Sequence, residues 1–377
     1  MRLLVVMVIV LAGVASCSTT SGTSAVPAIP AKPHLTAHDS LAPSAAALDV
    51  YAHDRPGLLS PGVAHFPARV YVPNSQENTV DVIDPATYKI IKTYRVGRRP
   101  QHVVPSWDLE TLWVNNNDGN TLTPIDPATA EPGKPVHVED PYNLYFSPDG
   151  SYALVMAERL NRLDFRDPHT MRLDHSLELP CKGVNHGDFT ADGSVFLVSC
   201  EFSGQLLAID WRAAKVVKII DVGAANMPQD VKLSPDGTLF YCADMAAGGL
   251  WLVDARTFAK AGFLRTGKGA HGLYVSRDSR VLYVSNRGEG SVSVVSFATR
   301  KKIAKWRLPG GGSPDMGGVS ADGRQLWLSG RYHRAVYVIS TSTGKLIRKI
   351  KVGAGPHGLC VYPQPGRYSL GHTGVFR

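Results

Sequence analysis

The chain has little of what the common enzyme signatures require, and no long helical pattern. Five cysteines are present, but none lies in Cys-x-x-Cys-His. No His-Glu-x-x-His, Gly-x-Ser-x-Gly or phosphate-cradling glycine loop occurs either. These absences exclude the usual signatures of covalent haem attachment, zinc proteolysis, esterase chemistry and P-loop nucleotide binding. No stretch after the N-terminal apolar run repeats its apolar residues with a long helical period, so we expect a β-rich fold.

Long hydrophobic runs are also scarce, and the one that exists lies at the N-terminus. Arg2 precedes the apolar residues 3–14, a run that is typical of a signal-peptide core and short for a membrane span. The segment from Leu11 to Cys17 resembles a bacterial lipobox. We therefore predict a lipoprotein signal peptide over residues 1–16 and lipidation of Cys17. An ordinary secretory signal with an incidental cysteine is the alternative.

The composition predicts one large extracytoplasmic domain behind a tether. Residues 17–48 are rich in Ser, Thr, Ala and Pro, which favours a flexible tether. Residues 49–68 form a lead-in segment that we expect to pack on the domain. The domain itself spans residues 69–362, and we assign no role to the tail, residues 363–377. The lipid anchor would hold this protein to a bacterial membrane, at the cell surface or in the periplasm.

A turn motif recurs along this domain with a period of 41–44 residues. It is clearest at Ser147-Pro148-Asp149-Gly150 and Ser234-Pro235-Asp236-Gly237. Including weaker copies, the turn aspartates are Asp108, Asp149, Asp192, Asp236, Asp278 and Asp322. Four short apolar runs with turn residues between them fill each period. A repeat of this length with four antiparallel strands predicts the blade of a β-propeller.

Counting the repeats gives seven blades in a closed ring. Six full units begin near Gly97, Pro141, Cys181, Ala224, Lys268 and Gly310. The segment from Arg69 to Arg95 reads as a blade without its inner strand, and 358–362 reads as an inner strand alone. We predict that the C-terminal strand completes the N-terminal blade. Closure of this kind leaves only short, protected edges, so we expect a monomer.

Several blade motifs resemble those of the YVTN repeat family of seven-bladed propellers. The similar segments are Tyr71-Val72-Pro73-Asn74, Tyr283-Val284-Ser285-Asn286, two Ile-Asp-Pro-Ala-Thr strand endings and Gly353 to Gly358. The resemblance covers residues 69–362 and implies an all-β propeller of four-stranded blades. The family is similar to surface-layer proteins, nucleic-acid-binding periplasmic propellers, cofactor-bearing dehydrogenase and nitrite reductase propellers, and lactonases. A shared fold does not choose among these functions.

Four cysteines remain in the domain. Cys242 and Cys360 lie within predicted strands and are expected as buried apolar residues. Cys181 and Cys200 lie at the same end of one blade. In an oxidising compartment they are candidates for a disulfide, although the sequence alone does not fix their separation.

A layer of polar residues marks the start of the inner strands. It follows a recurring proline, and four of the thirteen histidines fall in it at intervals of two blades. Because the inner strands line the axial channel, we predict a ligand-binding funnel there. Its residues are Gln101, His102, Tyr142, Asn143, Asn185, His186, Gln229, Asp230, His271, Asp315 and His357.

A metal ion is one alternative for this layer. Imidazoles suit Zn, Cu or Fe, and the candidate ligands are His102, His186, His271 and His357. Side chains alternate along a strand, so the first two need not face the same way as the last two. The mouth of the channel is also wide for metal–ligand bonds of about 2.0–2.3 Å. Hydrogen bonding to neighbouring blades and water is the simpler interpretation, and a small anionic or polar ligand is another.

Two classes of function remain. The first is a surface-tethered propeller that binds a polymer, a protein or a small molecule through its funnel face. The second is a metal- or cofactor-dependent enzyme of oxidoreductase or lactonase type, with Asn143, Asp230 and Asp315 as candidate ligands in the latter. Arginines of the rim alternate with carboxylates and few aromatics lie there, which argues against nucleic-acid binding. We favour the first class because no catalytic motif is present.

Overall fold

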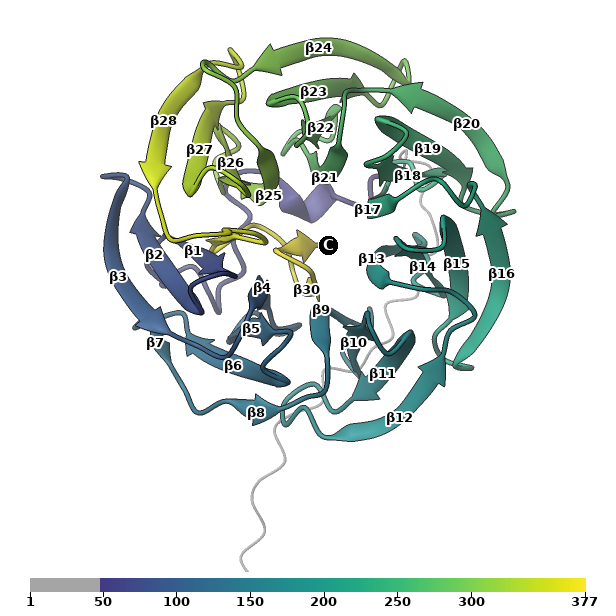
Figure 1. Ribbon diagram of the computed structural model, residues 1–377, viewed down its shortest axis with the longest axis horizontal. Helices are drawn as coiled ribbons and strands as arrows, with labels where there is room; N and C mark the ends of the chain where they lie inside the picture. Colours follow the sequence, from purple (N-terminus) through teal and green to yellow (C-terminus); the bar gives the residue numbers. More distant parts are fainter. Residues whose placement is uncertain (1–47) are drawn as a thin grey trace, which may run out of the picture. The chain divides into compact units, whose positions relative to one another are not determined.

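The computed structural model describes residues 48–377, and in this part of the chain seven β-sheets surround one axis (Figure 1). The predicted seven-bladed, all-β propeller is confirmed. The predicted signal peptide, Cys17 and the tether up to residue 47 lie outside the described residues. None of the helices in residues 48–377 is long and apolar enough to cross a membrane.

Each blade consists of antiparallel strands that follow one another in sequence from the axis outward, except that β29 is the inner strand of the first blade. The elements before and within the first four blades are η1 (Ala52–Asp54), β1 (Arg69–Asn74), β2 (Thr79–Asp84), β3 (Lys89–Arg95), β4 (Pro100–Pro105), β5 (Leu112–Asn116), β6 (Thr121–Asp126), β7 (Glu131–Pro132), β8 (Val136–His137), β9 (Pro141–Phe146), β10 (Ala153–Ala157), β11 (Arg162–Arg166), β12 (Leu173–Glu178), β13 (Val184–Phe189), β14 (Val195–Cys200), β15 (Gln205–Asp210) and β16 (Lys215–Asp221). The remaining elements are β17 (Pro228–Leu233), β18 (Leu239–Asp244), β19 (Gly249–Asp254), β20 (Lys260–Arg265), β21 (Ala270–Val275), β22 (Val281–Asn286), β23 (Ser291–Ser296), β24 (Lys301–Arg307), β25 (Pro314–Val319), β26 (Gln325–Gly330), β27 (Ala335–Ser340), β28 (Leu346–Lys351), β29 (Cys360–Tyr362), β30 (Ser369–Gly371) and β31 (Val375–Phe376).

The repeated turn joins the first two strands of a full blade, and its side chains explain the repeat. In the third blade, the Ser147 hydroxyl donates to the Asp149 carboxylate (2.8 Å) and accepts from the backbone N–H of Tyr152 (3.0 Å). The same Ser/Thr–Asp hydrogen bond occurs in all six copies of the turn. These side chains satisfy backbone groups that the hairpin cannot pair, which stabilises the turn.

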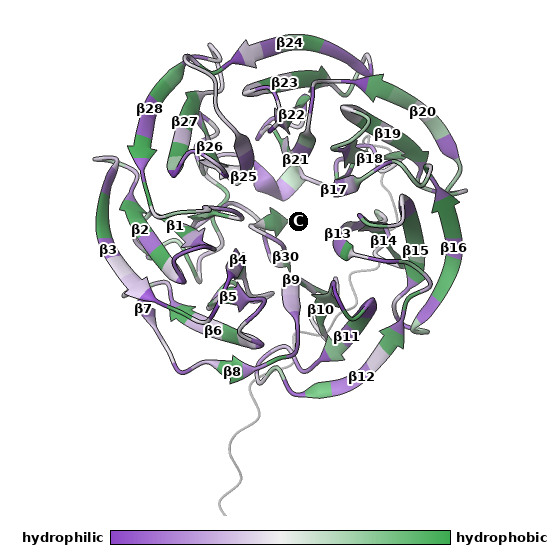
Figure 2. Cartoon of the chain, viewed as in Figure 1, coloured by the Kyte–Doolittle hydropathy of each residue, from purple (hydrophilic) through white to green (hydrophobic). Residues whose placement is uncertain are grey.

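The ring is closed as the sequence predicts. Strand β29 pairs antiparallel with β1, with Val361 opposite Val70, so the inner strand of the first blade comes from the far end of the chain. The apolar residues between the first and last blades, among them Trp327 and Val336, pack in one cluster. In Figure 2 the hydrophobic colour concentrates on middle strands such as β15 and β23, whereas the outer strands β12 and β24 are mixed. Burial between the middle strands therefore holds the blades together.

Each inner strand contains one residue more than its partner across the same stretch. In β4, for example, Gln101 and His102 together lie opposite Asn115. The same excess occurs in the other blades of residues 69–362. An extra residue of this kind is a β-bulge, and it interrupts the alternation of side chains along the strand. The bulges coincide with the polar layer.

The tail, to which we assigned no role from the sequence, forms a hairpin inside the ring. Strands β30 and β31 join the sheet of the third blade beside β9, with Gly371 opposite Tyr145. Figure 1 shows the C-terminal residue near the centre of the ring. The hairpin enters from the end of the channel that carries the Ser–Asp turns, which we call the turn end. There Ser369 bonds to the backbone carbonyl oxygens of Pro105 and Trp107.

The lead-in segment crosses the same turn end. The Tyr51 hydroxyl donates to the carbonyl oxygen of Leu233 at 2.8 Å, and Leu59 bridges to Gly366 of the tail. The last residue, Arg377, stacks on Tyr51 and pairs with Asp188 at 2.7 Å. The lead-in and the tail thus cover the turn end together. The opposite end of the channel, where the inner strands begin, we call the funnel end.

Candidate functional site

Four inner strands bring the four predicted histidines to one place on the axis. The ring of His102 lies 4.8 Å from that of His357 and 5.6 Å from that of His186, centre to centre. His271 lies 6.0 Å from His186 and 5.9 Å from His357. The histidines occupy two successive positions of the inner strands, which in a regular strand would face opposite ways. Here they face the same way, because the bulges turn both positions toward the axis.

A fifth histidine, His372, completes the group from the tip of the tail. Its ring lies 4.8 Å from His186 and 5.3 Å from His102. His372 and Thr373 have positive φ angles of 38° and 42°, as the central residues of a type I′ hairpin turn do. Such angles are costly for Thr, and this kind of strain concentrates at functional sites. We expected a channel too wide for metal–ligand bonds. That expectation was wrong, because the tail hairpin lies inside the ring beside β9.

The donor atoms fall into two groups of three. His102, His186 and His372 form the first, and His271, Asp315 and His357 form the second; within each group the ligand atoms lie within 4.8 Å of one another. All six residues are buried. We call these groups the three-histidine group and the carboxylate group.

The three-histidine group contains buried nitrogens that lack partners. Both ring nitrogens of His102 and both of His186 find no hydrogen-bond partner among the described residues. The amide of Asn143 contacts Nδ1 of His372 at 2.9 Å, and Nε2 of His372 lies 3.4 Å from the Asp230 carboxylate. Buried polar atoms are rarely left unpaired, so this group calls for an explanation.

The ring of His102 fits only because residue 358 is a glycine. The backbone of Gly358 bonds to Gln101 and Val103 on the neighbouring blade. A Cβ on Gly358 would lie 2.0 Å from Nδ1 of His102. Any side chain at residue 358 would therefore collide with the ring of His102.

In the carboxylate group, Asp315 lies between two imidazoles. Its Oδ1 is 3.1 Å from Nδ1 of His271 and 3.2 Å from the guanidinium of Arg287, and its Oδ2 is 3.6 Å from Nε2 of His357. The sulfur of Met316 lies 3.0 Å from the same Nδ1 of His271. Asp315 Oδ2 and His357 Nδ1 form no hydrogen bond within residues 48–377.

Burial sets the protonation of the histidines. It lowers the pKa of all five rings well below the usual value, and neighbouring positive charges, chiefly Arg287 for His271 and Arg331 for His357, lower it further. The rings are therefore neutral near pH 7, which is the form that binds metals. Burial acts on Asp315 in the opposite sense and raises the pKa of its carboxyl group.

The other predicted funnel residues have different surroundings. Asn143, Asn185 and Asp230 use their polar atoms locally; Asp230, for example, accepts the backbone N–H groups of Val231 and Leu273 and so ties two blades together. The ring of Tyr142 packs edge-on against His102 at 5.5 Å. Gln101 and Gln229 each keep a buried side-chain oxygen that is unpaired in the described part of the chain.

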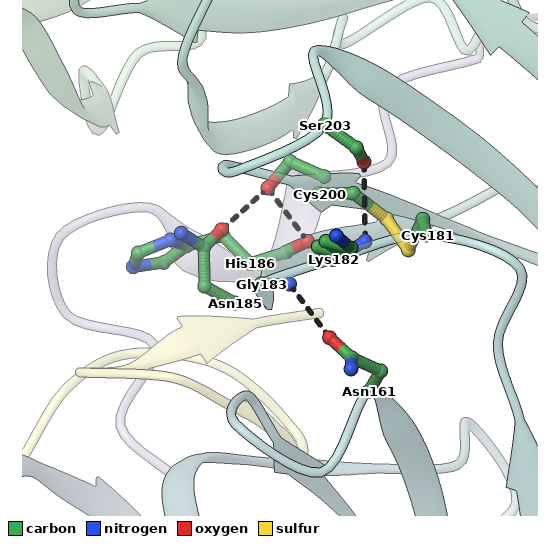
Figure 3. Close-up of a disulfide and its surroundings, with 9 residues drawn as sticks. Asn161, Cys181, Lys182, Gly183, Asn185, His186, Cys200 and Ser203 are labelled. Atoms are coloured by element: carbon green, nitrogen blue, oxygen red, sulfur yellow. Dashed lines mark hydrogen bonds between the residues drawn. A yellow bond between two sulfur atoms is a disulfide. The ribbon is translucent and has the colours of Figure 1, made fainter.

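Cys181 and Cys200 are joined by a disulfide in the blade that carries His186 (Figure 3). Both cysteines lie on one side of the bulge of the fourth blade, because Cys200 lies opposite Val184 and Ser199 lies opposite His186. The Ser199 hydroxyl donates to the side-chain oxygen of Asn185 (2.8 Å) and lies 3.2 Å from the carbonyl oxygen of His186. In Figure 3 the imidazole of His186 points away from the disulfide. The disulfide and these hydrogen bonds fix the backbone from which His186 projects.

The rim of the funnel end carries charges of both signs, as the sequence indicates. Glu158 and Glu201 lie there in largely buried positions; burial and the charge of Glu201 raise the pKa of Glu158 to about 8. Most rim arginines are paired, namely Arg159 with Asp118 and Asp140, Arg162 with Glu139 and Asp164, and Arg334 with Glu77. Paired charges of both signs give no strong field of one sign at this rim.

His372 was not among the predicted site residues, and no sequence pattern points to it. This residue lies outside the repeat, so no comparison of blades aligns it with the other histidines. Only the docking of the hairpin brings it to them.

Fold and geometry together define a seven-bladed β-propeller with a cluster of neutral imidazoles on its axis. A family model for YNCE-like β-propellers matches residues 56–366, and the chain belongs to this family. No curated relative matches the sequence.

Similar solved structures share the fold at low identity. A chain of hydrazine synthase from Kuenenia stuttgartiensis is 17% identical, with a TM-score of 0.64 over 75% of this chain and 98% of that one. A protein of unknown function from Desulfotomaculum acetoxidans DSM 771 is 16% identical, with a TM-score of 0.64 over 78% and 98%. The dihydro-heme d1 dehydrogenase NirN in complex with DHE is 14% identical, with a TM-score of 0.59 over 81% and 78%. At such identities the similarity concerns the fold alone.

Proposed function

We propose that this protein is a tethered binding propeller whose axial channel holds a transition-metal ion on His102, His186 and His372. The observation that carries the proposal is the pair of buried imidazoles, His102 and His186, whose four nitrogens have no partner within residues 48–377. Each unpaired buried polar group costs about 1–3 kcal/mol. A bound cation would accept the lone pair of one nitrogen in each ring and so remove the cost at that nitrogen.

The donor set narrows the class of ion. Three neutral imidazoles from different blades and the tail suit Zn or Cu, and a fourth position remains for water or a small ligand. The Asp230 carboxylate is held by two backbone N–H groups and lies 3.4 Å from Nε2 of His372. An ion bound at Nδ1 of His372 would take the place of the contact with Asn143, and Asp230 would orient the ring through Nε2, as carboxylates commonly do behind metal-bound histidines.

An oxidoreductase-like activity is the second candidate, because a three-histidine set leaves a coordination position open. The lactonase-like alternative has less support. It requires Asn143, Asp230 and Asp315 to converge as oxygen ligands, but Asn143 and Asp230 bond to the backbone of their own and neighbouring blades.

The sequence also supports a lipid anchor at Cys17, which would place the propeller at an extracytoplasmic membrane surface. This part of the proposal rests on the lipobox-like segment alone. Radiolabelled palmitate should be incorporated into the wild-type protein expressed in a bacterial host and not into Cys17→Ser. Equal labelling of both would overturn it.

Metal analysis tests the central proposal. The protein is purified without affinity tags that bind metals, and its metal content is measured by mass spectrometry. Chelated protein is then titrated with Cu²⁺ or Zn²⁺ in a calorimeter. We expect the wild type to bind tightly, and His102→Gln or His186→Gln to lose at least tenfold in affinity.

A matched control is His169→Gln. The His169 side chain is 75% exposed and lies in the turn between β11 and β12, outside the inner strands. This variant should bind as the wild type does. Equal affinity of the wild type, His102→Gln and His186→Gln would overturn the proposal, because the bound ion would then lie elsewhere.

A further inference from the structure

We infer that the carboxylate group, His271, Asp315 and His357, is a second metal site and that the channel holds two adjacent ions. This inference extends the proposed function, on which it rests. It gives the protein a paired metal centre in place of a single ion.

The first support is the way Asp315 is held. Arg287 contacts its Oδ1 at 3.2 Å, while its Oδ2 has no hydrogen-bond partner in residues 48–377 and lies 3.6 Å from Nε2 of His357. Metal-bound carboxylates are commonly oriented in this way, with one oxygen fixed by a neighbouring donor and the other left to the ion. Arg287 would thus be a positioning residue.

The second support is the spacing of the donor atoms. Two ligands at about 2.1 Å from one tetrahedral ion lie roughly 3.4 Å apart. Oδ2 of Asp315 lies 3.6 Å from Nε2 of His357, close to this value. One ligand atom from each of His271, Asp315 and His357 lies within 4.8 Å of the other two, so small movements of the side chains would place all three around one ion.

The two groups lie directly beside each other. His357 of the carboxylate group is 4.8 Å from His102 of the three-histidine group, and His271 is 6.0 Å from His186, ring centre to ring centre. These contacts are ring against ring. Two ions held by the two groups would therefore be close enough to share a bridging ligand.

The groups differ in chemistry, which makes them separable. Three imidazoles form a neutral donor set that suits Cu or Zn. Two imidazoles and one carboxylate carry a negative charge and form the set that also binds Fe(II), with further positions open. The sulfur of Met316, 3.0 Å from Nδ1 of His271, adds a soft neighbour that favours copper at this position.

An ordinary ion pair between Arg287 and Asp315 is the alternative. It would explain Oδ1 of Asp315. It leaves Oδ2 of Asp315 and Nδ1 of His357 buried without a partner in the described residues. A second ion accounts for the carboxylate oxygen and for the convergence of both rings on it.

The test measures the number of ions and their coupling. Chelated full-length protein is loaded with Cu²⁺, dialysed, and analysed for copper by mass spectrometry and by electron paramagnetic resonance. We expect two copper ions per chain, with a signal weakened or broadened by coupling between neighbouring Cu²⁺ ions. In Asp315→Asn and His357→Gln we expect one ion per chain and the full signal of isolated Cu²⁺.

Controls separate the second site from the first and from unfolding. Glu110→Gln removes an exposed carboxylate and should keep both ions. A melting curve of each variant shows that it is folded, and His357→Gln gives a second route if Asp315→Asn does not fold. One outcome would overturn the second site and keep the first: the wild type binds one copper ion per chain, His186→Gln loses it, and Asp315→Asn retains it. Two uncoupled ions that both variants retain would also overturn it, and no bound copper at all would remove both proposals.

Discussion

Replacing His186 by leucine should have opposite effects on stability with and without metal. In the metal-free protein both ring nitrogens of His186 are buried and lack hydrogen bonds from residues 48–377. Leucine has a similar volume and no polar atom, so it removes an uncompensated desolvation cost. We expect the metal-free variant to be more stable than the wild type by about 1–3 kcal/mol.

Bound metal should reverse the order of stability of the wild type and His186→Leu. An ion that binds only the folded state stabilises it by about 4.1 kcal/mol at a concentration one thousand times the dissociation constant. The wild type should gain this amount, whereas His186→Leu, with one ligand fewer, should gain little. At saturating Zn²⁺ we therefore expect the wild type to be the more stable of the two.

Differential scanning calorimetry measures both effects, once with EDTA and once with excess Zn²⁺. For domains of 150–250 residues, 1 kcal/mol corresponds to about 2–4 °C in melting temperature, so a shift of several degrees is expected in each direction. His169→Leu serves as the control, because an exposed substitution changes stability by roughly 0.5 kcal/mol or less. A metal-free His186→Leu protein less stable than the wild type would refute the reasoning, since the ring would then have had partners of its own.

Three further predictions concern the fold and its response to pH. Truncation before Pro356 removes the buried Leu359 together with β29, which contains the buried Cys360 and Tyr362. It should lower the melting temperature sharply, because burial of each large apolar side chain contributes about 1.5–3 kcal/mol; an unchanged melting curve would contradict ring closure. The pKa of His186 is lowered in the folded state, so the unfolded chain takes up its proton first and folding stability falls as the pH drops below about 6.5. Between pH 7.5 and 5.5 the metal-free wild type should therefore lose up to about 1.4 kcal/mol more than His186→Leu in denaturant titrations, and equal losses would show that the folded ring titrates normally. Reduction of the disulfide between Cys181 and Cys200, or Cys181→Ser, should cost about 3 kcal/mol, given their separation of 19 residues, and a melting temperature insensitive to dithiothreitol would rule this out.

Most of the fold was predictable because it is local and repeated. Each Ser–Asp turn is made by residues within five positions of one another, as Ser147, Asp149 and Tyr152 show. Closure followed from counting, since a blade without an inner strand and an inner strand without a blade complete each other. The strand boundaries near Arg69 and Tyr362 follow from the same pattern.

The candidate site was predictable only in part. The recurring polar layer contains His102, His186, His271 and His357, and the structure brings all four together. Their orientation was not predictable, because each bulge depends on the pairing of the inner strand with its neighbour. Without the bulge, the alternation of side chains would have separated His102 from His357.

The repeat, the number of blades and the layer in which polar residues gather were predictable from the sequence alone, because these depend on short-range turns and on the period of the chain. The composition of the site within that layer depends on long-range contacts. The docking of the tail hairpin brings His372 beside His186, and the packing of Gly358 against His102 sets the distance between the two groups of ligands. Contacts between residues more than 180 positions apart leave no local pattern in a sequence, and here they form the site.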